Sequence, residues 1–455
     1  MTRRRSVWFI AVAVGALLGT SGIVGASAAP PATADATAVM QWNLIAVSTI
    51  TGVPGPGLPG PAGGAPPASQ VNMGMVQGAV YDAVNAITPK HHQPYLLKRR
   101  FANTASDEAA VATAAYLVLK NIVETVPQSI PFPNRATLLA TLASQYEAAK
   151  NAIPDSPFKD QGIAAGTAAA QAMIDARKND GRFGPSQFVP NPNPGFFDPV
   201  APNGTTVLDP TPWVGGVKPF LMQSSSQFRS AGPPALNSAA WAADFNEVKA
   251  LGGDGVVTPS ARTATQTYVA RWWQSNPVAS WNDVARQLIA QDHLDAADSA
   301  RVLAMQNLAA ADAAINTWND KYHFSFWRPF QAIRRAGEPA EGNPATLPDP
   351  TWTPLLAAPY PDHVSGHLGL DSSHTAVLRM FFGNAPAGGY QITSFFVNPG
   401  GPATRSFSSF SQAVDEIVEA RIWAGLHYRT ADVQAVELGE NVANFAMENY
   451  FQPAG

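Results

Sequence analysis

The chain has 455 residues, of which 46% are hydrophobic and only 14% are charged, against a typical charged share of about 25%. The formal net charge is −4, and Lys and Arg form no basic stripe, so nothing indicates a nucleic-acid partner. Cysteine is absent, which excludes disulfides, thiol nucleophiles and Cys-ligated metal sites. So low a charge content is expected either of burial between subunits, as in a homo-oligomer, or of an extracellular setting.

The N-terminus has the composition of a targeting segment. Arg3, Arg4 and Arg5 form a basic stretch, residues 7–24 are apolar or small, and Ala26-Ser27-Ala28 resembles a cleavage site. We expect a signal peptide over 1–28 and a secreted or cell-envelope protein, with an uncleaved anchor as the alternative; the Sec and Tat routes both stay open. No later stretch approaches the ~20 apolar residues of a membrane span, so no stable span is expected after signal removal.

Helical periodicity dominates the N-terminal region, which we place at 29–200. Alanine-rich runs favour helix over strand, and a Pro/Gly loop occupies 53–67. The predicted helices are 36–51, 68–88, 105–125, 134–152 and 159–179. Residues 180–236 are rich in Pro, Gly and Asn and are predicted to be irregular, with room for a short helix. Within them, 201–236 is assigned as the connecting loop.

Helical signals resume in the C-terminal region, 237–455, which we expect to be catalytic. Thr258-Pro259 has the pattern of a helix start, with an N-cap followed by proline. The predicted helices are 237–252, 258–275, 279–291, 294–319, 366–383, 407–424 and 431–450. No sustained alternation typical of strands is present. The predicted fold class is all-α, with helical bundles in two halves and long Pro/Gly-rich loops.

The first block that carries chemistry runs from Lys321 to Arg328 and Pro329. Seven residues are two helical turns, so both cations can share one helix face. Alternatively, Pro329 ends the helix and Arg328 points in from a loop. Two buried like charges are unfavourable unless an anion joins them, although two solvated surface cations would give the same pattern.

The second block is Ser365-Gly366-His367, directly before an apolar helix. The free N–H groups of a helix N-terminus attract an anion, Ser365 adds a hydroxyl donor, and Gly366 lets the backbone approach a ligand closely. His367 is expected in the first turn. Taken alone, the block also fits an ordinary helix cap.

The third block contains Arg421, Gly425, His427 and Asp432. Arg421 is expected near the end of a helix for which Gly425 is a natural C-cap. His427 follows in the loop, and Thr430 or Asp432 can cap the next helix. Each of these residues also has a purely structural interpretation.

In this order and spacing, the three blocks resemble the superfamily of vanadium-dependent haloperoxidases and type-2 phosphatidic acid phosphatases. The superfamily pattern is Lys-x6-Arg-Pro, then Pro-Ser-Gly-His, then Arg-x5-His, and this chain matches it over 315–440 except that Val364 replaces the Pro. The aromatic residues around Trp327-Arg328, together with Trp318, are similar to the haloperoxidase branch.

The resemblance implies a cage for a tetrahedral oxyanion, either vanadate or phosphate. The cage residues would be Lys321, Arg328, Ser365, Gly366 and Arg421. The resemblance makes His427 the axial ligand of a vanadate cofactor in a haloperoxidase. In a phosphatase, which needs no cofactor, His427 would be the nucleophile that forms a phosphohistidine. His367 would be the acid–base residue in both.

Two positions depart from the family pattern. The superfamily Asp usually lies four residues after the last His, whereas Asp432 lies five after His427; it either orients that imidazole or caps the following helix. Tyr360 stands where the family has a Phe or His associated with halide preference, so no halide is assigned.

The leading hypothesis is an exported vanadate-dependent haloperoxidase that oxidises halide with hydrogen peroxide. The second is a secreted acid phosphatase of the same fold acting on a phosphate ester. The third is a non-catalytic oxyanion-binding protein that keeps the cage.

Overall fold

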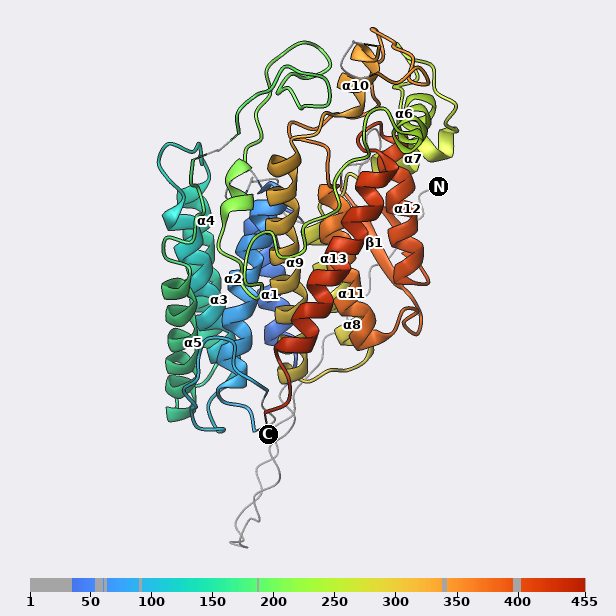
Figure 1. The fold of residues 1–455 in the computed structure, drawn as a ribbon. Coiled ribbons are helices and arrows are strands. Elements are labelled where there is room, and N and C mark those ends of the chain that lie inside the picture. The colour runs from blue at the N-terminus through green and yellow to red at the C-terminus, as the bar shows by residue number, and fades with distance from the viewer. Residues whose placement is uncertain are drawn as a thin grey trace, which may run out of the picture. The chain divides into compact units, whose positions relative to one another are not determined.

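The computed structural model describes residues 35–53, 60, 64–89, 92–185, 188–337, 342–395 and 402–454. Within them it contains thirteen α-helices, a short 3-10 helix and one two-stranded hairpin, so the predicted mainly helical fold is confirmed (Figure 1). The expected signal peptide, 1–28, lies outside the described residues. Among the described helices, none is long and apolar enough to cross a membrane.

The five helices of the N-terminal region begin and end close to the predicted boundaries. Ser106 and Ser156 each accept a backbone N–H from the third residue after them, and so cap α3 and α5. Proline occupies the first turn of α2 and α5, where no N–H is needed. The helices are α1 (Thr37–Thr51), α2 (Pro66–Asn85), α3 (Asp107–Thr125), α4 (Arg135–Ala152) and α5 (Pro157–Ala176).

The irregular segment after α5 contains the 3-10 helix η2 (Pro212–Gly216), in line with the short helix expected there. The boundary that we drew at 201–236 stays a prediction. The C-terminal region continues with α6 (Ala239–Leu251), α7 (Ala264–Trp272), α8 (Pro277–Gln291), α9 (Ala296–Phe324), α10 (Pro329–Arg335), α11 (Gly366–Phe382), α12 (Phe410–Trp423) and α13 (Arg429–Asn449).

Two local predictions were wrong. No helix begins at Thr258-Pro259; α7 begins at Ala264, because Thr263 and Gln266 form a reciprocal capping box there. The hairpin of β1 (Tyr390–Ser394) and β2 (Ala403–Phe407) was not predicted. Its strands have five residues each, too few for an alternation to stand out.

Helix α9 lies at the centre of the packing. It packs against α2 on one side and against α11 and α13 on the other, while α3 and α5 pack together beyond α2. In Figure 1, α3, α4 and α5 lie to the left of α2 and α9, and α11, α12 and α13 lie to the right. A side chain near the end of α9 is therefore shielded from several directions, which sets the environment of Lys321.

Candidate functional site

The first block is divided between two helices. Lys321 lies in the last turn of α9, which ends at Phe324 because Ser325 adopts a left-handed conformation with φ 47°. Arg328 is the N-cap of α10, and Pro329 is the first residue of that helix. The prediction that Lys321 and Arg328 share one helix face was therefore wrong. The alternative prediction correctly placed Arg328 after the end of α9. Pro329, however, begins α10 and does not end a helix.

The second block is placed as predicted. Ser365 is the N-cap of α11, Gly366 is its first residue and His367 lies in the first turn. A Cβ atom at Gly366 would lie 3.1 Å from the Trp318 ring, so any larger residue would push the start of α11 and the Trp318 ring apart by a few tenths of an ångström. The unpaired N–H groups of the first turn are thereby placed beside the residues of α9.

The third block spans the end of α12 and the start of α13. Arg421 lies in the last turn of α12, and Gly425, with φ 71°, follows the C-cap residue Ala424. Helix α13 has Tyr428 as its N-cap, without a side-chain cap. The suggestion that Thr430 or Asp432 caps this helix was therefore wrong, because both already lie inside it.

All three cations of the predicted cage are buried. Lys321, Arg328 and Arg421 are 0%, 1% and 2% exposed. The Lys321 ammonium donates to the backbone oxygens of Pro361 and Asp362, each at 2.9 Å. Burial, and secondarily the charge of Arg328, lowers the pKa of Lys321 well below its usual value.

The two guanidinium groups are only partly satisfied by the protein. Arg328 donates from Nε to the Tyr360 oxygen and from Nη1 to the Leu426 oxygen, both at 2.7 Å. Arg421 donates from Nη1 to the Trp273 oxygen at 2.8 Å. Within the described part of the chain, Arg328 Nη2 and Arg421 Nε are buried and have no hydrogen-bond partner. Because a buried unpaired N–H is costly, these donors indicate a place for an external acceptor.

His427 is held between a cation and a carboxylate. Its Nε2 lies 3.2 Å from Arg328 Nη1, and its Nδ1 lies 2.8 Å from Asp362 Oδ1. A guanidinium nitrogen can only donate, so Nε2 must accept and the proton of the neutral ring must be on Nδ1. Burial, followed by the charge of Arg328, lowers the pKa of His427 well below its usual value, which keeps the ring neutral. The ring therefore has a fixed orientation and an unprotonated Nε2.

His367, the second histidine, is half-buried, with Nε2 3.3 Å from the Ser275 oxygen. Burial and the charge of Arg421 lower its pKa well below the usual value, and the Ser275 carbonyl opposes that shift. The neutral ring is therefore suited to taking up a proton rather than supplying one at rest.

Three buried carboxyl groups surround the cations, and the sequence argument had considered only one of them. Asp362, Asp371 and Asp432 are 0%, 1% and 0% exposed. Burial raises the pKa of Asp362 and of Asp371 to about 7, and raises that of Asp432 well above its usual value. Burial thus disfavours the charged form of each carboxyl group, as it does that of Lys321.

Asp362, and not Asp432, is the carboxylate bonded to His427. The suggestion that Asp432 orients this imidazole was therefore wrong. Asp432 lies nearer Ser365 and Arg421, both of which lower its pKa against the larger effect of burial. The signal for Asp362 was its place in the Tyr-Pro-Asp segment before the second block, but nothing in its spacing pointed to His427.

A small cavity of about 60 Å³ lies beside the start of α11. Gly366, His367, Trp318 and Tyr360 contribute to its lining, together with Asp209. The rings of Trp318 and Tyr360 have centroids 5.3 Å apart, and Lys321 Nζ lies 5.1 Å from the Tyr360 centroid. The supporting positions Trp318 and Tyr360 thus lie next to the cage.

Sequence reasoning missed Asp209. Its Oδ2 accepts hydrogen bonds from Trp318 Nε1 at 2.9 Å and from the Tyr322 hydroxyl at 2.7 Å. It lies in the irregular segment before η2, where no periodic pattern could single it out. Asp209 therefore fixes the Trp318 ring from the side away from Gly366.

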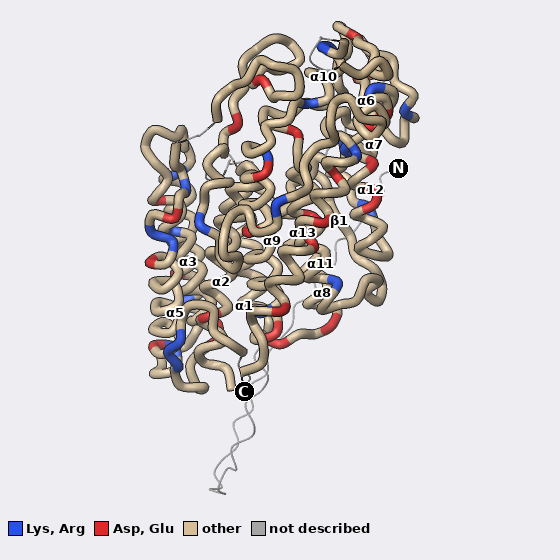
Figure 2. Tube along the Cα trace, in the orientation of Figure 1, with Lys and Arg blue, Asp and Glu red and all other residues tan. Residues whose placement is uncertain are grey.

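Charge is thinly distributed elsewhere. Figure 2 shows Lys and Arg intermingled with Asp and Glu along the trace, with no continuous stretch of one sign. The cage is therefore set apart by burial, since Lys321, Arg328 and Arg421 lie in the interior.

The donor set fits vanadate or phosphate. Two guanidinium groups with unpaired N–H donors, a buried ammonium and the first turn of α11 offer charge-assisted hydrogen bonds to the oxygens of a tetrahedral anion. The unprotonated Nε2 of His427 carries the lone pair that a bond to the central atom needs. The arrangement thus serves either chemistry expected of such a cage.

Comparison with known proteins gives a consistent result. Residues 301–454 match the model of the VCPO second helical-bundle domain. Vanadium chloroperoxidase of Curvularia inaequalis is 25% identical over 413 residues, covering 76% of this chain and 65% of that protein. The chain therefore spans slightly under two thirds of this relative's length.

Two solved bacterial structures share the fold. One is described as the first bacterial vanadium-dependent iodoperoxidase; it has a TM-score of 0.71, 21% identity, and coverage of 94% of this chain and 99% of that one. The other is a holo-type bacterial vanadium-dependent chloroperoxidase, with a TM-score of 0.65, 17% identity, and coverage of 86% and 93%. These structures show the fold, while residues 301–454 match the helical-bundle domain of the vanadium haloperoxidases and the chain is similar to a vanadium chloroperoxidase.

Proposed function

We propose that this chain is a vanadate-dependent haloperoxidase, which oxidises halide with hydrogen peroxide. One observation carries the proposal: two buried arginines with unpaired donors lie near a histidine whose Nε2 is unprotonated and whose ring is fixed. When bound, vanadate would supply a Lewis-acid centre that activates hydrogen peroxide toward halide.

The residues of the cage would have different roles. Arg328, Arg421, Ser365 and the N–H of Gly366 would bind the vanadate oxygens and spread their charge. Lys321 would polarise one oxygen, since its ammonium is held in place by two backbone carbonyls. Backbone carbonyls already hold Lys321, Arg328 and Arg421 in place, whereas the contact between Arg328 Nη1 and His427 Nε2 would open when the anion binds.

The two histidines have separate roles. His427 would hold the central atom through Nε2, with Asp362 keeping the proton on Nδ1. His367 would take a proton from the incoming peroxide, because burial and Arg421 keep its ring neutral. Trp318 and Tyr360 border the same cavity and would shape the path of the small substrates.

The test compares two activities of the purified chain. With orthovanadate, peroxide and bromide, we expect halogenation of a phenolic dye that depends on vanadate. A parallel assay without vanadate measures hydrolysis of p-nitrophenyl phosphate, with the His427→Ala variant as the control. Phosphatase turnover without halogenation would establish the phosphatase alternative. Vanadate binding without either activity would establish a non-catalytic oxyanion-binding protein.

We propose in addition that the protein is exported. The support is the basic stretch Arg3–Arg5, the apolar residues 7–24 and the small residues Ala26-Ser27-Ala28. N-terminal sequencing of protein expressed from the whole sequence should give a start near Ala29, in a fraction outside the cytoplasm. An intact N-terminus in the cytoplasm would contradict export.

A further inference from the structure

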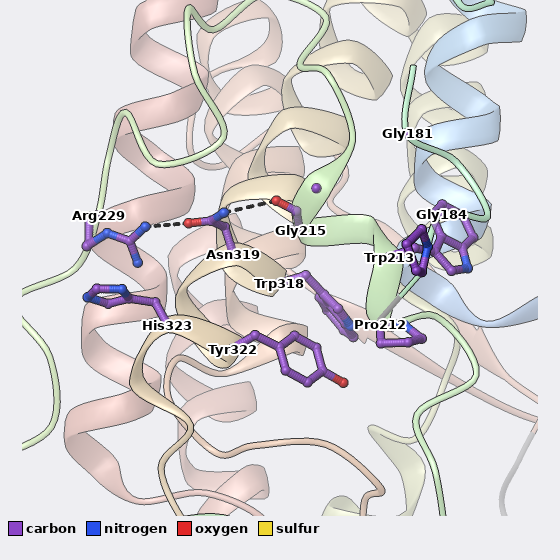
Figure 3. A pocket seen from close by; sticks show the side chains of 12 residues that line it. Gly181, Gly184, Pro212, Trp213, Gly215, Arg229, Trp318, Asn319, Tyr322 and His323 are labelled. Carbon is purple, nitrogen blue, oxygen red and sulfur yellow. Dashed lines mark hydrogen bonds between the residues drawn. The ribbon is translucent and has the colours of Figure 1, made fainter. Parts of the chain in front are cut away.

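A second, larger cavity lies on the other side of Trp318. Its volume is about 520 Å³, within the ~300–1,000 Å³ of small-molecule sites. One wall is the last part of α9, and the facing wall is η2 with the turn after α5. Figure 3 shows Trp318, Tyr322, Asn319 and His323 projecting from α9 on one side, with Trp213 opposite.

The lining is aromatic on its walls and polar along one edge. Trp213, Trp318 and Tyr322 supply ring faces and edges, whereas Arg229, Asn319 and His323 supply polar groups. Flat aromatic ligands pack well against such rings. The cavity therefore suits a planar aromatic molecule with a polar group at one end.

The polar edge is rigid and nearly neutral. Arg229 Nη1 pairs with Asp320 at 3.1 Å, and its Nη2 donates to the Asn319 side chain. Asn319 donates in turn to the Gly215 oxygen at 3.0 Å, as the dashed lines in Figure 3 show. Because Asp320 offsets the charge of Arg229, the edge favours a hydroxyl group over a full anion.

Trp318 links this cavity to the cage. It lines both this cavity and the small one beside Gly366 and His367. Lys321 Nζ lies 5.7 Å from the Trp318 ring centroid. A ligand in the large cavity would thus lie one aromatic side chain away from the site where oxidised halogen would form.

We infer that the large cavity binds the organic acceptor of the reaction, a phenol of one or two rings. The choice of a phenol rests on the proposed function, because electron-rich rings accept electrophilic halogen. Peroxide, halide and a proton would give hypohalous acid and water. The ring carbon would then form a bond to halogen and lose its hydrogen, and the hydroxide of the hypohalous acid would leave with that proton as water.

Gly216 provides a way to block the cavity without touching the cage. It lines the cavity, its φ lies outside the left-handed region, and a Cβ placed on it would meet no atom within 4 Å. A leucine side chain can therefore extend into the cavity without strain at the backbone. Alanine at the same position is the matched control, since one methyl group fills little of the space.

The binding test uses 2-naphthol and the chain without vanadate, measured by isothermal titration calorimetry. We expect saturable 1:1 binding that Gly216→Leu weakens at least about tenfold, as loss of a well-packed ring contact would, whereas Gly216→Ala changes it little. Thermal unfolding of both variants checks that they fold. Absence of saturable binding, or equal binding by folded Gly216→Leu, would overturn the inference.

A kinetic test separates this inference from the proposed function. In the vanadate-loaded protein, Gly216→Leu should raise KM for 2-naphthol about tenfold, while the rate of iodide oxidation without any organic acceptor stays unchanged. Naphthol binding that is sensitive to Gly216 in a chain without haloperoxidase activity would retain the cavity and reject the proposed function. Halogenation with no dependence on Gly216 would retain the proposed function and reject the inference about the cavity.

Discussion

The N-terminal and C-terminal regions of the helical core contain the same buried polar features. Trp42-Asn43 in α1 corresponds to Trp281-Asn282 in α8, and the two asparagines meet, with Nδ2 of Asn43 2.7 Å from Oδ1 of Asn282. All four residues are buried. The two regions thus contact each other through a hydrogen bond between two buried asparagines, one on α1 and one on α8.

A buried aspartate repeats in the same way on the two packed helices α2 and α9. Asp82 and Asp312 are 1% and 0% exposed, and each accepts three consecutive backbone N–H groups. The donors are Tyr95, Leu96 and Leu97 for Asp82, and Phe220, Leu221 and Met222 for Asp312, at 2.6–2.9 Å. Both carboxylates anchor an irregular segment to a helix.

The difference lies in what is left unsatisfied. Both oxygens of Asp82 and of Asp312 have partners, whereas Arg328 and Arg421 in the cage keep buried donors unpaired among the described residues. Buried polar groups that have partners stabilise the fold, while the unpaired donors of Arg328 and Arg421 offer hydrogen bonds to a ligand. Substitutions should therefore separate stability from binding.

The largest expected effect is on binding. His427→Ala removes the nitrogen that would hold the central atom, so vanadate affinity should fall by more than the ~10–100-fold typical of substitutions one shell further out. Equilibrium dialysis with orthovanadate measures this, and circular dichroism confirms folding. Vanadate retention equal to that of the unaltered chain would remove His427 from the ligand position.

The second effect separates chemistry from binding within the cage. His367→Ala should lower halogenation turnover by about 10²–10⁴-fold, the usual contribution of an acid–base residue, because no neighbouring group replaces its proton transfer. Vanadate affinity should change little. Loss of affinity with unchanged turnover per bound vanadate would show that His367 only binds the anion.

The repeated aspartates should show the opposite behaviour. Asp312→Ala leaves three buried N–H groups unpaired and should lower the free energy of unfolding by about 3–5 kcal/mol, with a similar loss for Asp82→Ala. Urea denaturation measures the change, and Asp312→Asn, which keeps one acceptor oxygen, should lose less. A loss under about 1 kcal/mol would contradict their role as anchors.

Asp362 belongs to both kinds of group. It is a buried carboxyl group with a hydrogen-bond partner, and that partner, His427, is a residue of the candidate site. Asp362→Ala frees the imidazole to rotate and change tautomer, so vanadate affinity should fall by about 10–100-fold. Asp362→Asn keeps an oxygen for the Nδ1–H and should retain most of the affinity. Equal losses in the two variants would mean that the charge of Asp362 matters, and not its hydrogen bond.

The last effect concerns the pH dependence of stability. Asp371 accepts a hydrogen bond from Trp281 Nε1 at 2.6 Å, and burial raises its pKa to about 7, whereas an unfolded Asp titrates near ~3.9. Between these values the folded chain holds a proton that the unfolded chain releases. Stability should therefore fall as the pH rises from about 4 to about 7, by at most ~1.4 kcal/mol per pH unit from this group.

Asp371→Asn, which keeps an acceptor but cannot titrate, should flatten that slope. Denaturant unfolding of both proteins at several pH values in this window gives the comparison. Parallel slopes for the two proteins would show that Asp371 keeps its charge when buried.

Much of the helical scaffold could be predicted because its signals are local. Capping residues such as Ser106 and Ser156, and prolines in first turns, define helix ends within a few residues. The start at Thr258-Pro259 failed because Thr263 and Gln266 provide a better cap five residues later. The hairpin failed because its strands are too short to show a period.

The residues of the candidate site also differ in whether the sequence could identify them. The resemblance of three short blocks to a superfamily pattern singled out Lys321, Arg328, Ser365, Gly366 and His367. It could not identify Asp362 as the partner of His427, 65 residues away, or Asp209 as the partner of Trp318, 109 residues away. These pairs form because α9, α11 and the start of α13 pack together, and no local pattern records that packing.

The sequence by itself determined the mainly helical class and most helix boundaries, since each depends on neighbours within a few turns, while the residues of the cage stay a prediction from the resemblance. Only the tertiary structure decided which nitrogen of His427 is unprotonated, which carboxylate bonds to the ring and which donors stay unpaired. Those properties depend on burial and on contacts between segments distant in the chain, because desolvation and hydrogen-bond geometry exist only after the helices have packed.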